Sequence, residues 1–101
     1  MWILRSSGPQ ESGRAGRTFR ISAGNPRTIG RSAMADFRVD VAMVSRVHCR
    51  FTVAFDGQLE IEDLSSTNGT FVNNARVGRA ALAAGDRVRI GKLEMVVVRG
   101  H

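Results

Sequence analysis

Residues 44–74 of this chain, VSRVHCRFTVAFDGQLEIEDLSSTNGTFVNN, decide its fold. Apolar and polar residues alternate over residues 47–55 and again over 59–64, and a period of two is typical of half-buried β-strands. Asp56-Gly57, between the two runs, is a favoured hairpin-turn pair. The polar clusters SRVH at 45–48 and SSTNGT at 65–70 flank the hairpin. A hairpin carries both clusters to the same end of a sheet, where loops on a rigid scaffold commonly form binding sites.

Short strand patterns continue on both sides of this hairpin. Upstream we expect strands over residues 2–5, at a sheet edge, and over 18–21, 27–29 and 35–40. Downstream we expect strands over 70–72, 87–90 and 93–99, with Asn73-Asn74 as a turn that tolerates positive φ. Residues 6–16 are rich in Gly and Ser, and the alanine run 80–84 is too short for a helix, so we expect both to be loops. About ten or eleven short, mostly antiparallel strands predict an all-β fold, a β-sandwich.

Length and composition are those of one globular domain. The chain has 101 residues, of which 43% are apolar and 24% charged, so we expect a single domain over residues 1–101. No apolar run approaches the roughly 20 residues of a membrane-spanning helix, and the first residues do not form a signal peptide. We therefore expect a cytoplasmic protein that does not insert into membranes.

The net charge of +6 favours an anionic partner. The arginines are scattered, only one lysine is present, and aromatic residues are few. This composition lacks the stacking platform of a single-strand-binding surface, so we expect no nucleic-acid partner.

The two polar clusters, preceded by Gly30-Arg31, resemble in their order and spacing the signature of the forkhead-associated (FHA) domain. The resemblance is strongest over residues 18–98. It implies a β-sandwich with its binding loops at one end, acting as a phosphopeptide-binding module that recognises phosphothreonine. It also implies a signalling adaptor downstream of Ser/Thr kinases, with a phosphothreonine-containing protein as partner and no cofactor.

The resemblance implies a role for each residue of the motif. Arg31 reaches the phosphate and Ser45 donates its hydroxyl to it. Thr67 lies against the phosphothreonine, and Asn68 holds the ligand backbone with its amide. Arg46, by adjacency, adds a second cation at the mouth of the pocket. These residue types suit a phosphate, because arginine offers a planar two-pronged grip and hydroxyls rotate to fit.

Three further residues are expected to support the site rather than contact the ligand. Gly30 is expected to be a bend that aims Arg31, and Gly69 is expected to belong to the loop turn. His48, by resemblance, is a buried, hydrogen-bonded support of the Ser45 loop.

Catalysis and metal binding are disfavoured by the same residues. A Ser45/His48 pair alone suggests nucleophilic catalysis, but neither an orienting carboxylate nor a GxSxG motif accompanies it, so we do not expect an enzyme. His48 and Cys49 are adjacent in a strand pattern and face opposite sides, so we expect no metal site.

Three alternatives stay open at this stage. One is a small basic nucleic-acid binder, which a tight, strongly salt-dependent complex with random oligonucleotides would favour. Residues 41–44 (VAMV), just before Ser45, are apolar and either pack inward or form an exposed lip beside the pocket. The same fold could also serve as a structural assembly domain that binds an unphosphorylated partner.

Overall fold

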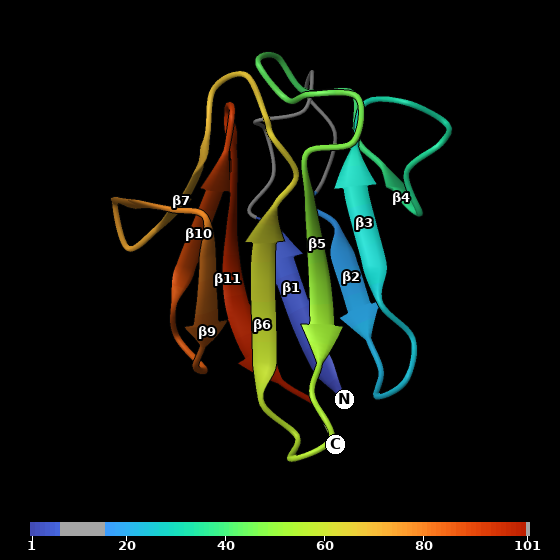
Figure 1. Ribbon diagram of the computed structural model, residues 1–101, viewed down its shortest axis with the longest axis vertical. Coiled ribbons are helices and arrows are strands. Elements are labelled where there is room, and N and C mark those ends of the chain that lie inside the picture. The colour runs from blue at the N-terminus through green and yellow to red at the C-terminus, as the bar shows by residue number, and fades with distance from the viewer. Residues whose placement is uncertain (7–15, 101) are drawn as a thin grey trace.

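Eleven β-strands form two sheets packed face to face in the part of the chain that the computed structural model describes, residues 1–6 and 16–100 (Figure 1). One sheet has the strand order β2 (Thr18–Ile21), β1 (Trp2–Ser6), β11 (Leu93–Arg99), β10 (Arg87–Ile90), β7 (Thr70–Val72) and β8 (Ala75–Val77). The other has the order β4 (Phe37–Arg38), β3 (Arg27–Gly30), β5 (Cys49–Val53), β6 (Leu59–Asp63) and β9 (Arg79–Leu82). Every strand pair is antiparallel except β3 with β4. The predicted all-β sandwich is confirmed.

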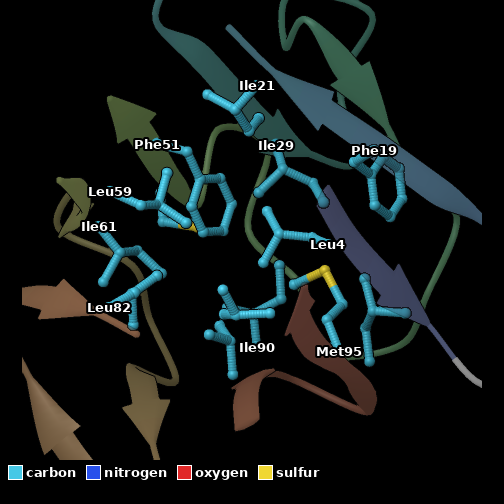
Figure 2. Close-up of a cluster of buried hydrophobic side chains, with 14 of the residues drawn as sticks. Leu4, Phe19, Ile21, Ile29, Phe51, Leu59, Ile61, Leu82, Ile90 and Met95 are labelled. Carbon is cyan, nitrogen blue, oxygen red and sulfur yellow. The ribbon is translucent and has the colours of Figure 1, made fainter. Parts of the chain in front are cut away.

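The hairpin of β5 and β6 forms in the register that its alternation predicts, from Cys49 opposite Asp63 to Val53 opposite Leu59. The inward residues of both sheets point toward one another and form one core (Figure 2). Phe51 of β5 is fully buried, whereas Arg50 beside it is exposed. Burial of this apolar surface is the main driving force for folding. Cys49 belongs to the same core, and burial raises the pKa of its thiol, so it is a structural hydrophobe.

Four local predictions were wrong. Strand β1 is internal, between β2 and β11, because its inward Trp2 and Leu4 need neighbours on both sides to be buried. The alanine run expected to be a loop is largely strand β9, which pairs with β6 and buries Leu82 opposite Leu59. The strand expected over 35–40 is reduced to β4, and strand β8 was not predicted at all. The loop predicted for residues 6–16 falls mostly on 7–15, which lie outside the described residues.

The topology places three loops at one end of the sandwich: the β3–β4 loop, the segment from β4 to β5, and the β6–β7 loop (Figure 1). The β5–β6 turn at Gly57 lies at the opposite end (Figure 1). The described residues form no helix long and apolar enough to span a membrane.

Candidate functional site

The three loops enclose a depression of about 510 Å³. The structure brings all five predicted binding residues to its lining, Arg31, Ser45, Arg46, Thr67 and Asn68. The other lining residues, which sequence reasoning did not assign to the pocket, are Met43, Val44, Val47 and Ser65. The three predicted supporting residues, Gly30, His48 and Gly69, are all buried.

Gly30 ends strand β3 at a point where only glycine fits. A Cβ added there would lie 2.1 Å from the Arg46 carbonyl oxygen, far inside contact distance. This close approach lets the Arg31 amide donate to the Ser45 carbonyl at 3.0 Å, and the Ser32 amide to the Arg46 carbonyl at 3.0 Å. The backbone of the Ser45 loop is thereby fixed against the end of β3, with Arg31 at the edge of the depression.

His48 is buried beneath the depression and connects the Ser45 loop to the β6–β7 loop through hydrogen bonds. Its Nδ1 accepts a hydrogen bond from the Ser45 amide at 3.0 Å, so Nε2 carries the proton and donates to the Gly69 carbonyl at 2.9 Å. Burial lowers the pKa of His48, although the Gly69 carbonyl and the Asp63 charge oppose that shift. The ring is therefore neutral at pH 7 and holds two loops in a fixed relation.

Two further hydrogen bonds cross between these loops at the surface. The Thr67 amide donates to Ser45 Oγ at 3.0 Å, which leaves the Ser45 hydroxyl proton available for an acceptor in the depression. The Asn68 side-chain amide donates from Nδ2 to the Met43 carbonyl at 3.0 Å, which fixes the side chain at the edge of the depression and leaves its Oδ1 free to accept. The donors and acceptors are thus oriented before any ligand arrives.

Asp63 organises the β6–β7 loop, and sequence reasoning missed it. Its carboxylate accepts hydrogen bonds from the Ser66 hydroxyl and amide and from the Thr70 hydroxyl. The Ser66 hydroxyl oxygen in turn accepts from the Gly69 amide at 3.0 Å. Burial raises the pKa of Asp63, but these hydrogen bonds outweigh burial and hold the pKa below its ordinary value. An aspartate at a strand end followed by a run of Ser and Thr is a turn signal that could have identified it.

The apolar segment 41–44 does both things that the sequence left open. Val41 and Val44 are buried in the core, whereas Met43 is 51% exposed at positive φ on the rim of the depression. The turn at Gly91 packs against this segment, since a Cβ there would lie 2.6 Å from the Ala42 carbonyl oxygen. The apolar lip beside the depression is therefore the exposed side chain of Met43, on a turn against which the Gly91 turn packs.

The depression is electrostatically unbalanced. Its lining contains two arginines and no carboxylate. Among the described residues, neither the Arg31 nor the Arg46 guanidinium has an ion-pair or hydrogen-bond partner. Within the same residues, no three His, Cys, Asp or Glu side chains are grouped to hold a metal ion. The arrangement suits a small, multiply charged anion displayed on a peptide.

The fold and the site define a β-sandwich module with an arginine-lined depression on the loops of one end. The chain belongs to the FHA domain family, whose family model matches residues 27–91. It is 44% identical over 88 residues to the FHA domain-containing protein FhaA of Mycobacterium tuberculosis, a match covering 86% of this chain and 16% of FhaA. It is 41% identical over 71 residues to the glycogen accumulation regulator GarA of Mycolicibacterium smegmatis, covering 70% of this chain and 44% of GarA.

Among solved structures, the chain is similar to one from a structural and functional analysis of phosphothreonine-dependent FHA domain interactions. The TM-score is 0.78 at 35% sequence identity, covering 99% of this chain and 97% of that chain. The expected family is confirmed. The curated relatives are much longer than the matched region, since the chain spans less than half of either FhaA or GarA.

Proposed function

We propose that this domain binds phosphothreonine in a partner protein through the depression between its three loops. The observation that carries the proposal is the pair of unpaired guanidiniums, Arg31 and Arg46, beside a Ser45 hydroxyl whose proton is free to donate. The similarity to a structure studied for phosphothreonine-dependent FHA interactions supports it.

Each residue has a role that its position allows. Arg31 grips two phosphate oxygens with its planar fork, and Ser45 donates to a third. Thr67 lies beside the phosphothreonine, while Asn68 accepts a hydrogen bond from the ligand backbone at Oδ1. Arg46, which is exposed, adds charge at the mouth of the depression.

The module acts as a non-catalytic signalling adaptor downstream of a Ser/Thr kinase, in the cytoplasm, with residues 1–101 folding as one domain. Catalysis by Ser45 is disfavoured because His48 Nδ1 contacts the Ser45 backbone amide rather than its hydroxyl, so the ring is not placed to take the hydroxyl proton. A regulatory role agrees with GarA, which is named a regulator.

Calorimetry with three matched peptides tests the proposal. A phosphothreonine peptide should bind with roughly micromolar affinity, because a short extended peptide buries little surface. The phosphoserine peptide should bind at least about fourfold more weakly, since it lacks one buried methyl. The unmodified peptide should not bind measurably. Equal affinity for the phosphorylated and unmodified peptides would instead favour an assembly domain with an unphosphorylated partner.

A further inference from the structure

Positive charge is unevenly divided between the two sheets. The strands of the β2-β1-β11-β10-β7-β8 sheet carry one acidic residue, Glu94, against six arginines, Arg5, Arg20, Arg76, Arg87, Arg89 and Arg99. The strands of the other sheet are nearly balanced, with three acidic residues, Glu60, Glu62 and Asp63, and four arginines, Arg27, Arg38, Arg50 and Arg79. The excess charge of the strands therefore belongs to one side of the sandwich.

Strand register places most of these arginines on the outer face of their sheet. Arg5 lies opposite Val96, which lies opposite Arg87, so the two arginines are two strand spacings apart, about 10 Å. In the adjacent cross-strand row on one side of this pair, Arg20 lies opposite Ile3. In the adjacent row on the other side, Arg89 lies opposite Glu94. The inward neighbours of these positions are core residues, so the arginine side chains point to solvent. We call Arg5, Arg20, Arg87 and Arg89 the basic face.

The two outer faces also differ in how their charges are paired. On the balanced sheet, Arg50 pairs with Glu62 and Arg79 with Glu60, at 2.5 and 3.0 Å. On the basic face, none of Arg5, Arg20 and Arg87 has an ion-pair partner among the described residues. Like charges about 10 Å apart on one face repel one another, and salt at physiological concentration screens part of this repulsion. Glu94, opposite Arg89, offsets part of this charge, and an anionic partner would offset the excess that remains.

We propose that the basic face is a second docking surface, distinct from the three-loop depression, which takes an acidic, carboxylate-rich segment of a partner protein. Arginine forks match carboxylates in bidentate geometry. Ile3, Val96 and Val98, which lie among these arginines, are half-buried and make the centre of the surface partly apolar, as in protein interfaces. The surface is independent of the proposed phosphothreonine site.

Other occupants fit the basic face less well. A second copy would bring its own basic face or its nearly balanced opposite face, and neither supplies an excess of negative charge. The Phe71 ring, beside the basic face, is covered by the Arg89 guanidinium at 4.2 Å, so it is not open for nucleic acid bases to stack on. A membrane needs several protruding apolar side chains on one face. Of the four exposed large apolar side chains among the described residues, Met1 adjoins β1 of the sheet that carries the basic face, whereas Met34, Met43 and Phe55 lie on loops of the other sheet.

A nuclear magnetic resonance titration of the isotope-labelled domain with a poly-glutamate peptide at physiological salt tests this surface. We expect amide shifts in β1, β10 and β11 and binding that weakens steeply with added salt. The double variant Arg5→Gln/Arg87→Gln should bind the peptide about fivefold more weakly. The matched control, Arg50→Gln/Arg79→Gln, removes the same formal charge from the other face and should change the affinity by less than about twofold. Circular dichroism checks that both variants are folded.

Several results would contradict the proposed docking surface. Shifts confined to the three loops, equal weakening in both double variants, or no binding of the peptide would each overturn the proposal. Parallel titrations with random duplex DNA and phosphatidylserine vesicles test the other occupants. Tighter binding of either one, lost in Arg5→Gln/Arg87→Gln, would also overturn it. Phosphothreonine-peptide affinity of Arg5→Gln/Arg87→Gln should stay within about twofold of the original protein, so a failure here does not affect the proposed function.

Discussion

The Thr67 amide donates a hydrogen bond to Ser45 Oγ at 3.0 Å, between residues 22 positions apart in the chain. Because the oxygen is already an acceptor, the hydroxyl hydrogen is directed away from Thr67. The proposed phosphate donor is therefore positioned by the loop that also meets the phosphothreonine. Preorganisation of this kind reduces the free-energy cost of ordering the site when a ligand binds.

Replacing Ser45 with alanine should weaken phosphothreonine-peptide binding by about 1.5–3 kcal/mol, the range for a hydrogen bond to a charged group. Folding should lose less than about 1 kcal/mol, since the exposed Thr67 amide can turn to water. Calorimetry and urea unfolding measure the two effects. Ser22→Ala, in the exposed β2–β3 turn at the other end of the sandwich, is the control and should change neither (Figure 1). Undiminished binding by Ser45→Ala would show that this hydroxyl does not contact the phosphate.

Replacing Gly30 with alanine should destabilise the fold by at least about 2 kcal/mol, because the new Cβ would collide with backbone that cannot move aside. Gly78→Ala is the matched control: its added Cβ would meet nothing within 4 Å, and its φ is not positive. We expect it to change stability by less than about 0.5 kcal/mol. Thermal unfolding of both variants measures this difference in stability. Equal midpoints would mean that the Arg46 backbone shifts to accommodate the new Cβ at little cost.

The lowered pKa of His48 makes stability depend on pH in a defined direction. The unfolded chain binds a proton near the ordinary value of 6.5, whereas the folded ring resists protonation. The contribution of the neutral ring is therefore complete above pH 6.5 and is lost as the pH falls through the folded pKa. The free energy of unfolding should decrease between about pH 7 and pH 5. A magnetic resonance titration of the His48 ring measures the cause directly, and a midpoint at or above 6.5 would contradict it.

Much of the fold was predictable because most of its longer strands alternate between buried and more exposed residues. Strands β2, β7, β10 and β11 have the predicted bounds, and Asn73 and Asn74 have the predicted positive φ, at 50° and 69°. Strand β9 was not predictable from its own sequence, since alanines carry no strand preference and only the pairing with β6 makes them extended. The internal position of β1 depends on β11, more than 85 residues later, and local pattern contains no such information.

The loop motifs were predictable as a group because their order and spacing form a family signature. The family resemblance also indicated His48 as a support of the Ser45 loop, but the sequence did not reveal the other contacts that hold the loops. The hydrogen bonds of Asp63 to Ser66 and Thr70 form only once the β6–β7 loop has turned. Gly30 is required by the backbone of Arg46, which is distant in sequence and close in space. The basic face could not be predicted from the sequence either, since its arginines are scattered along the chain and only the strand register places them on one face.

The most direct test of the central claim compares Arg31→Ala with Arg20→Ala for binding of one phosphothreonine peptide by calorimetry. Both arginines are exposed and both variants lose the same formal charge, but only Arg31 lines the depression. Arg31→Ala should cost on the order of 2–5 kcal/mol, because the bound phosphate loses its bidentate partner. Arg20→Ala should cost a few tenths of a kcal/mol at most, through long-range attraction that salt screens. Equal losses in the two variants would show that general basicity holds the phosphate and that the three-loop depression is not the binding site.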